Sequence, residues 1–280
     1  MNRPRSLLLL AACTLLAVAG CRYVDPEFQS TVTRNIVYGD AINEDGQLEQ
    51  LKLDLYTPAG DSATNRPVVI WAHGGSFVSG DKSTGAAWAT EYARRGYVAA
   101  SINYRMDEDG GPVTNPPDAY ETQRINWAIA DMKAAIRWFR ANAASLGIDP
   151  GKIAVAGSSA GAVMAVSTAV TPDDPGDTGD HLAHSSAVCT AISVSGATDP
   201  ALVDAGDAGA LFFHGDLDTT VPYSLAVATR DAMTAAGLRT KLHTFAGQGH
   251  GISGSHRVEI LDKTYGWLIQ RVVNAPEPCI

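Results

Sequence analysis

The sequence predicts an α/β fold, in which helices cover both faces of a mostly parallel central sheet. Short apolar runs rich in β-branched residues, such as PVVIWA at residues 67–72, are typical of strands that are covered on both sides. These runs alternate along the chain with helical patterns of ten residues or more, the order that produces parallel strands. In such sheets the carboxyl ends of the strands carry the functional groups, so chemistry is expected there.

Length and charge limit the organisation and the partners of the chain. With 280 residues, of which 45% are hydrophobic, the chain is long enough for one domain with a complete core. We expect a signal peptide at residues 1–20, a polar tether at 21–30 and a single folded domain at 31–280. The net charge of −9 comes from short acidic clusters, and no run of Lys or Arg offers a surface for phosphate groups. We therefore expect no nucleic-acid partner.

The first twenty residues have the pattern of a processing signal. A basic head precedes an apolar core at residues 7–18, which is too short to span a bilayer, and small residues at 18–20 precede Cys21. This end resembles a bacterial lipoprotein signal, which implies that Cys21 becomes a lipidated N-terminus held to one leaflet of a membrane. The absence of aspartate at position 22 favours the outer membrane of the bacterial cell envelope. The alternative is an ordinary signal peptide with a coincidental cysteine, and hence a secreted protein.

Each expected element has its own signal. The first two strands alternate in hydrophobicity around a turn and predict an edge hairpin, whereas later strands are continuous apolar runs. One helix ends at Gly96, and another carries an apolar residue every three or four positions and is closed by Gly147 and Pro150. The expected strands are residues 31–38, 51–56, 67–72, 97–102, 188–194, 208–213 and 241–245, the expected helices are 86–95, 125–139, 223–236 and 255–273, and a strand–turn–helix segment is expected at 152–170.

Two longer loops separate these elements. Residues 103–117 are rich in Gly, Pro, Asp and Asn and predict an irregular loop near one end of the sheet. Residues 171–186 contain four aspartates and two histidines, but their carboxylates lack the spacing of a metal-binding loop. A solvated acidic turn is therefore favoured over a metal site, and no metal or cofactor is expected.

The segment at residues 152–170 organises the rest of the chain, because its strand and helix are joined by Gly157-x-Ser159-x-Gly161. The flanking glycines have no Cβ to block a tight reversal, so the turn can lift the Ser159 hydroxyl clear of the sheet. The helix that starts at Ala160 points its free amides at any anion that forms beside the serine. This spacing alone is weak evidence for a nucleophile, so the assignment depends on whether the rest of the chain supplies a base, an acid and oxyanion donors.

Acyl transfer by a serine requires a base, a carboxylate that orients the base, and amide donors for the tetrahedral oxyanion. The glycine-rich loop HGGSF at 73–77 follows a buried strand, and its small residues let backbone amides turn towards Ser159. We therefore expect the amides of Gly75, Ser76 and Ala160 to form the oxyanion hole. The alternative is that these glycines merely end a strand. The histidine that opens the loop is expected to brace it by hydrogen bonding.

The acid and the base are expected on loops that follow later strands. HGDLDTTVP offers Asp216 and Asp218, of which one can orient the base while the other is solvated or caps the turn. His250 is framed by glycines on a loop beyond the last strand and is the expected base. His256 is the alternative, although it falls in the expected final helix, and His243 lies inside a strand and is expected to be structural.

Four motifs together resemble the α/β-hydrolase superfamily, and within it bacterial carboxylesterases of the hormone-sensitive-lipase and BD-FAE-like kind. HGGSF is similar to the HGGGF oxyanion motif, GSSAG to the GxSAG elbow, HGDLDTTVP to HGxxDxxVP, and GQGHG to the loop of the catalytic histidine. The resemblance covers residues 36–274 and implies the triad Ser159, Asp218 and His250, because the family's acid occupies the fifth position of HGxxDxxVP. Ser76 departs from the third glycine of HGGGF, which leaves its amide available and adds a hydroxyl beside the acyl pocket.

The sequence thus predicts a serine carboxylesterase that hydrolyses small-molecule or polymer-borne esters through an acyl-enzyme. The connection from 194 to 208 is too short for a helical lid, and an open site favours short acyl groups. Two alternatives stay open. One is a serine peptidase-like hydrolase, because such enzymes share a similar HGxxDxxVP segment, and the other is a catalytically inactive surface binding module on the same scaffold.

Two further sets of residues leave alternatives open. Cys189 and Cys279 remain once Cys13 has left with the signal and Cys21 is lipidated, and they either form a disulfide or leave Cys189 as a small core residue. Four aromatic residues are candidates to line a binding cleft, namely Trp71, Trp88, Tyr104 and Trp127. The alternative, that they belong to the core, is favoured.

Overall fold

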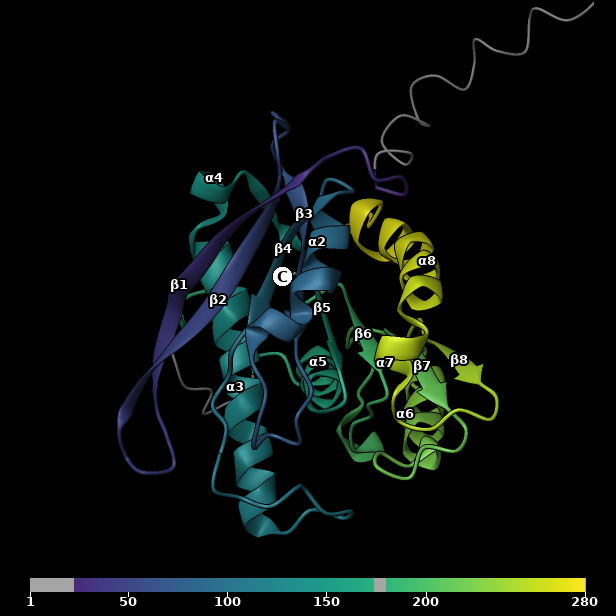
Figure 1. Cartoon of the computed structure of the whole chain (residues 1–280). Coiled ribbons are helices and arrows are strands. Elements are labelled where there is room, and N and C mark those ends of the chain that lie inside the picture. Colours follow the sequence, from purple (N-terminus) through teal and green to yellow (C-terminus); the bar gives the residue numbers. More distant parts are fainter. Residues whose placement is uncertain (1–22, 174–179, 280) are drawn as a thin grey trace, which may run out of the picture.

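The computed structural model describes residues 23–173 and 180–279, so the expected signal peptide and Cys21 lie outside the described residues. Within them, eight strands form one sheet in the order β1-β2-β4-β3-β5-β6-β7-β8 (Figure 1). The strands are β1 (Ser30–Ile42), β2 (Leu48–Pro58), β3 (Arg66–Ala72), β4 (Val98–Ile102), β5 (Ile148–Ser158), β6 (Thr190–Val194), β7 (Ala210–Gly215) and β8 (Lys241–Phe245). The helices are η1 (Lys82–Gly85), α2 (Ala86–Ala93), α3 (Ala119–Ala141), α4 (Ala143–Leu146), α5 (Ala160–Val170), η2 (Pro200–Leu202), α6 (Tyr223–Ala235), α7 (Ile252–Ser255), α8 (Arg257–Leu268) and η3 (Ile269–Val273).

The sheet is antiparallel at one edge and parallel over the rest. β1 and β2 form the expected hairpin, and β2 pairs antiparallel with β4. From β4 to β8, every neighbouring pair of strands is parallel, so the carboxyl ends of these strands meet at one edge. The predicted α/β fold with a mostly parallel sheet is therefore confirmed. The three expected triad residues follow β5, β7 and β8 and thus belong to this edge.

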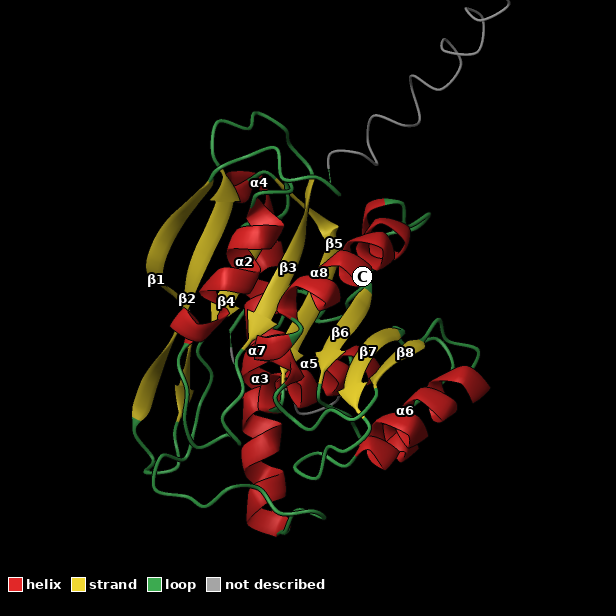
Figure 2. Ribbon diagram, turned by 45° about the vertical axis from the view of Figure 1, so that its right-hand side comes forward, coloured by secondary structure: helices red, strands yellow, loops and turns green. Residues whose placement is uncertain are grey.

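Helices cover both faces of the sheet (Figure 2). Since successive strand residues point to opposite faces, each buried strand contributes side chains to two core clusters. On one face, Val68 and Ile70 of β3 belong to a core cluster that includes residues of α3, α5 and α6. On the other face, Val69 and Trp71 of the same strand belong to a second cluster with residues of α2 and α8. The parallel strands are therefore buried on both sides, which explains their continuous apolar sequences.

Two helix ends differ from the sequence prediction. Gly147, at a φ of 61°, ends the short α4 rather than the long α3, and Pro150 lies within β5. The expected closing helix over 255–273 is present but begins at Arg257, because α7 ends at Ser255 and His256 separates it from α8, and its last turn, η3, is π-helical. The backbone of His256 has a φ of −118° and a ψ of 17°, outside the helical range, and its ring packs against Phe245 with the centroids 4.7 Å apart.

Three of the four aromatic candidates lie in the core. Trp71 of β3 and Trp88 of α2 stack with their ring centroids 4.2 Å apart, and Tyr104 is 1% exposed. Trp127 is half-buried, with the Arg105 guanidinium 5.8 Å from its ring centroid. These side chains therefore hold the layers together, as favoured from the sequence, and do not form an aromatic cleft.

A disulfide joins Cys189 to Cys279, whose Cα atoms are 5.0 Å apart, so the pairing left open by the sequence is present. The Cys279 amide also donates to the Gly151 carbonyl at 2.9 Å, and the Arg140 guanidinium donates to the Cys279 carbonyl at 2.7 Å. The bridge spans a sequence separation of 90 residues and restricts the unfolded chain. It fixes the end of the chain beside the start of β6.

At the carboxyl edge, β5, α5 and β3 approach so closely that two positions have room for glycine alone. A Cβ on Gly157 would lie 2.3 Å from the carbonyl carbon of Gly161. A Cβ on Gly161 would lie 2.2 Å from the carbonyl oxygen of Ala72 in β3. Both contacts involve backbone atoms, which cannot rotate away as a side chain can. They therefore fix the direction in which the chain leaves β5.

We expect Gly157→Ala to lower the free energy of unfolding by about 3 kcal/mol, because the added methyl forces the strand and the helix apart. The matched control is Gly266→Ala in α8, where an added Cβ meets nothing within 4 Å and alanine favours the helix. In thermal denaturation, the control should melt at or above the wild-type temperature and Gly157→Ala well below it. Equal melting temperatures for the two variants would contradict the packing argument.

Candidate active site

Ser159 occupies a sharp turn between β5 and α5. Its backbone has a φ of 54° and a ψ of −120°, a conformation that residues with a side chain rarely adopt. The Ser159 amide donates to the Val194 carbonyl of β6 at 2.9 Å, and its carbonyl accepts from the amides of Ala162 and Val163 at 2.9 and 3.0 Å. These bonds hold the turn in place, so that the half-exposed serine stands at the carboxyl edge of the sheet.

His250 and Asp218 complete a chain of hydrogen bonds that starts at Ser159. The Nε2 atom of His250 is 2.8 Å from Ser159 Oγ, and its Nδ1 atom is 2.8 Å from Asp218 Oδ2. A carboxylate can only accept, so Nδ1 donates to it and Nε2 is left to accept from the serine hydroxyl. The hydroxyl of Ser195 donates to the His250 carbonyl at 3.1 Å and steadies this loop. Such a chain can activate a serine for nucleophilic attack.

The two candidate carboxylates have different surroundings. Asp218 is 4% exposed, and its Oδ1 accepts from the amides of Thr220 and Val221 at 2.9 and 3.1 Å. Asp216 is exposed and accepts from the Gly247 amide at 2.7 Å, which ties the loop after β7 to the loop after β8. Asp218, and not Asp216, therefore faces the imidazole of His250.

Sequence reasoning missed one residue of the site. His214 of β7 is 0% exposed, and its Nε2 atom is 3.1 Å from the same Asp218 oxygen that His250 contacts. The Nε2 atom is also 2.9 Å from the Val221 carbonyl. A signal was present in the chain, since His214 ends a buried strand shortly before Asp218, but a histidine at that place is equally typical of a core residue.

The HGGSF loop turns back on itself beside the nucleophile. Gly75 and Ser76 both have positive φ values, of 132° and 53°. An added Cβ on Gly74 would lie 3.1 Å from Ser159 Cβ, so the loop backbone is in contact with the serine. Across the described residues, the amides of Gly75, Ser76 and Ala160 donate to no backbone carbonyl outside regular helices and strands. These donors are therefore available to a substrate oxygen.

His73 braces this loop, as expected from the sequence. It is 2% exposed, its Nδ1 atom is 2.7 Å from the Gly74 carbonyl, and its ring stacks on Tyr104 with the centroids 4.5 Å apart. The Tyr104 hydroxyl donates to the His73 carbonyl at 2.9 Å. Burial lowers the pKa of His73, opposed by the Gly74 carbonyl, so the ring is neutral at pH 7 and donates from Nδ1.

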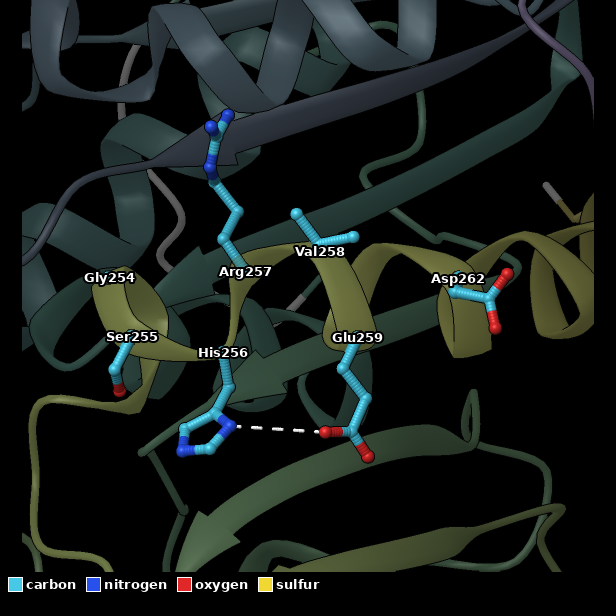
Figure 3. A pocket seen from close by; sticks show the side chains of 7 residues that line it. All are labelled: Gly254, Ser255, His256, Arg257, Val258, Glu259 and Asp262. Carbon is cyan, nitrogen blue, oxygen red and sulfur yellow. Dashed lines mark ion pairs between the residues drawn. The ribbon is translucent and has the colours of Figure 1, made fainter.

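The other two histidine candidates lie elsewhere. His256 lines a surface hollow of about 500 Å³, where its ring faces the Glu259 carboxylate at 3.9 Å (Figure 3). His243 belongs to β8, and its ring stacks on Phe213 with the centroids 5.3 Å apart. The described structure gives neither of them a hydrogen bond to Ser159, so the structural role expected for His243 is confirmed and His256 is not the base.

Several features are absent from the part of the chain that the structure describes. Residues 23–173 and 180–279 contain no group of three His, Cys, Asp or Glu side chains that could hold a metal ion, and the middle of the acidic loop lies outside these ranges. None of the helices in these ranges has both the length and the apolarity to cross a bilayer. The connection between β6 and β7 contains the short η2 and no longer helix, so no helical lid arises there.

Comparison with known proteins connects this geometry to esterases. The family model described as BD-FAE matches residues 53–203, and the model of the prolyl oligopeptidase family matches residues 195–274. An esterase of Thermogutta terrifontis, a species of the Planctomycetes, with bound butyrate aligns at a TM-score of 0.71 and 26% identity, over 90% of this chain and 97% of that one. The same esterase phosphonylated by cyclosarin aligns at 0.70 and 28% identity, over 89% and 96%.

The curated relatives match a shorter stretch. Liver carboxylesterase 1 of Oryctolagus cuniculus is 38% identical over 112 residues, which are 40% of this chain and 19% of the relative. Acylcarnitine hydrolase of Mus musculus is 34% identical over 127 residues, or 45% and 22%. The chain therefore spans about a fifth of the length of the curated relatives it matches. Because the BD-FAE match covers more than half of the 280 residues and the fold is that of the esterases, the chain belongs to the BD-FAE family of α/β-hydrolase carboxylesterases.

Proposed function

We propose that the protein is a serine carboxylesterase that hydrolyses short-acyl esters, with Ser159 as the nucleophile, His250 as the base and Asp218 as the acid that orients it. The observation that carries this proposal is the unbroken chain of 2.8 Å contacts from Asp218 Oδ2 through the imidazole to Ser159 Oγ. The similar esterase of Thermogutta terrifontis supports it, since that protein is phosphonylated by cyclosarin and sarin.

In the first half of the reaction, His250 Nε2 takes the proton from Ser159 Oγ while this oxygen attacks the acyl carbonyl carbon. The carbonyl oxygen becomes an oxyanion, which the amides of Gly75, Ser76 and Ala160 stabilise. When the tetrahedral intermediate collapses, the bond to the alcohol oxygen breaks and His250 gives its proton to this leaving group. The products are a free alcohol and an acyl group on Ser159.

In the second half, water releases the acyl group. His250 Nε2 removes a proton from water as it attacks the acyl-serine, and the same amides hold the second oxyanion. Collapse breaks the bond to Ser159 Oγ, which takes the proton back, and the carboxylic acid leaves. Asp218 keeps the proton on Nδ1 in both halves and stabilises the imidazolium that forms.

The preference for short acyl groups follows from the surroundings of the nucleophile. Ser159 and His250 are partly exposed at the carboxyl edge of the sheet, and the β6–β7 connection contains no helix longer than the three-residue η2. A long acyl chain at such a site stays in contact with water and gains little free energy from burial. Structures of the Thermogutta terrifontis esterase with bound butyrate and propionate support this preference. An open edge also suits esters carried on a polymer.

One observation favours a second candidate function, peptide-bond hydrolysis. Residues 195–274, which include Asp218 and His250, match the prolyl oligopeptidase family. Ser159 and the HGGSF loop fall outside that match and inside the BD-FAE match. Because the segment that carries the nucleophile and the oxyanion loop matches the BD-FAE family of carboxylesterases, we place ester hydrolysis first.

We also propose that Cys21 is lipidated and holds the enzyme at the bacterial outer membrane. Tyr23 is 9% exposed and packs edge-on against the Tyr97 ring at 5.0 Å, and Arg95 donates to the Val24 carbonyl at 2.7 Å. The expected tether is therefore held against the domain from residue 23, and a lipid on Cys21 would keep the domain close to the bilayer. Tyr97 precedes β4 at the amino edge of the parallel strands, so the catalytic edge would face away from the membrane.

Replacing single triad residues tests the proposed mechanism. Ser159→Ala should lower kcat for p-nitrophenyl acetate by about 10⁶-fold, and Asp218→Asn by about 10⁴-fold because asparagine favours the wrong tautomer of His250. The matched control is Asp216→Asn on the same loop: Asp216 does not contact His250, and the amide oxygen of asparagine can still accept from the Gly247 amide, so the rate should stay close to that of the wild type. Full activity of Ser159→Ala would end the assignment. Failure of a fluorophosphonate to label the folded wild type would favour the inactive binding module.

A panel of p-nitrophenyl esters tests the acyl preference. We expect kcat/KM to be highest from acetate to butyrate and lower for laurate by on the order of tenfold or more, because the long chain finds no apolar cover. Aminoacyl p-nitroanilides provide the peptidase arm, and their rates should stay below those of the esters. Faster cleavage of an anilide than of the acetate would reverse the order of the two candidate functions.

Fractionation of cells tests the lipid anchor. The wild-type protein should incorporate labelled palmitate and sediment with outer membranes, whereas Cys21→Ser should do neither, because acyl chains supply the binding free energy. Cys13→Ser, a change inside the expected signal core, is the matched control and should behave as the wild type. Membrane binding that is unchanged in Cys21→Ser would refute the anchor without affecting the proposed reaction.

A further inference from the structure

A second buried imidazole contacts the carboxylate of Asp218. His214 Nε2 lies 3.1 Å from Asp218 Oδ2 and 2.9 Å from the Val221 carbonyl, and its side chain is 0% exposed. The proposed reaction moves protons through His250 and leaves His214 without a role. A fully buried polar ring beside the acid of a triad therefore needs an explanation.

The contacts of His214 fix its protonation state. Both neighbours of Nε2 are acceptors, so this nitrogen carries a proton. The other nitrogen, Nδ1, is buried and has no hydrogen-bond partner among the described residues, so a proton there would be a donor without an acceptor. Burial accordingly lowers the pKa of His214, opposed by the Val221 carbonyl and Asp218. The ring is thus neutral, and its Nε2–H group donates to the Val221 carbonyl while it lies beside Asp218 Oδ2.

The Asp218 carboxylate is surrounded by donors on both oxygens. Oδ1 accepts from the amides of Thr220 and Val221, and Oδ2 faces the Nδ1 of His250 and the Nε2 of His214. All of these groups except His250 belong to β7 and the loop that follows it. The carboxylate is therefore positioned by its own segment, independently of the loop that carries His250.

We propose that His214 is a positioning residue that fixes Asp218 Oδ2 and sets the pH below which His250 stops acting as a base. An oxygen that already faces one donor interacts less strongly with a second donor. His214 thus weakens the attraction of Asp218 for a protonated His250, so the neutral form of His250 persists to lower pH. This inference rests on the proposed roles of Asp218 and His250.

The other polar groups packed around this cluster are a carboxylate and several hydroxyls, each with a hydrogen-bond partner. Asp216, on the same loop, is bonded to a backbone amide of the next loop, and Tyr223, at the start of α6, has its hydroxyl 2.6 Å from that of Thr244 in β8. The hydroxyls of Ser195, directly after β6, and of Ser159, directly before α5, face the cluster. Carboxyl and phenol groups ordinarily titrate well outside pH 6 to 7, so the acidic limb of an activity profile reports on the imidazoles.

The test is the pH dependence of kcat/KM for p-nitrophenyl acetate. His214→Phe keeps the bulk of the ring and removes the donor, and we expect kcat to fall on the order of tenfold, KM to change little and the acidic limb to move up by roughly 0.5 to 1 pH unit. His214→Gln places an amide N–H near the position of Nε2, so its acidic limb should lie close to the pH of the wild-type limb. His243→Gln, on the neighbouring strand β8 and without contact to Asp218, is the matched control and should keep the wild-type profile.

The proposal would be overturned if folded His214→Phe had its acidic limb at the same pH as the wild type. It would also be overturned if the limb of His214→Gln moved as far as that of His214→Phe. If His214→Phe does not fold, His214→Asn replaces it, since its shorter amide does not reach the position of Nε2. Its limb should then lie above that of His214→Gln, and coincident limbs would again overturn the proposal. Ser159→Ala distinguishes failure of this proposal from failure of the proposed function. If Ser159→Ala is inactive and the acidic limb of the His214 variants does not move, only the role of His214 is rejected. If Ser159→Ala is fully active, the triad itself is rejected.

Discussion

The backbone of Ser159, held at a φ of 54° between β5 and α5, is the constraint on which the rest of the site depends. A conformation of this kind costs on the order of 1–3 kcal/mol and persists only where its surroundings enforce it. Here β6 binds the Ser159 amide through the Val194 carbonyl, and the backbone contacts at Gly157 and Gly161 leave the chain no other exit from the strand. The hydroxyl is thus placed by inner strands of the sheet, whose hydrophobic residues are buried.

The acid and the base lie on loops, which are held by bonds between them. Asp216 accepts from the Gly247 amide at 2.7 Å, and the Leu217 amide donates to the Gln248 carbonyl at 2.9 Å. Ser195, at the end of β6, donates to the His250 carbonyl. The loops after β6, β7 and β8 are therefore joined into one layer above the carboxyl edge, which lets loop residues keep a geometry that the sheet alone would not give them.

The sequence was sufficient for the features that depend on local patterns. A buried strand followed by Gly157-x-Ser159-x-Gly161 contains its own turn, and parallel strands bring their carboxyl ends together whatever their order. The role of His214 could not be predicted in this way, because it depends on how the loop from Asp216 to Val221 folds back over the end of β7. The break at His256 is also a tertiary effect, since Phe245 of another element packs against that ring. The disulfide likewise required the distance between two distant segments.

A comparison of the groups beside each buried aspartate explains why Asp218 suits its proposed role in catalysis. In the described part of the chain, three other buried aspartates face a cation, namely Asp131 with Arg105 at 2.7 Å, Asp107 with Arg124 at 3.2 Å and Asp54 with Lys82 at 3.4 Å. Asp218 faces two imidazoles and two amides instead. A permanent cation beside Asp218 would already neutralise its charge, and a protonated His250 would then gain less from it. Neutral donors satisfy the oxygens of the carboxylate and keep its negative charge for the moment at which His250 becomes positive.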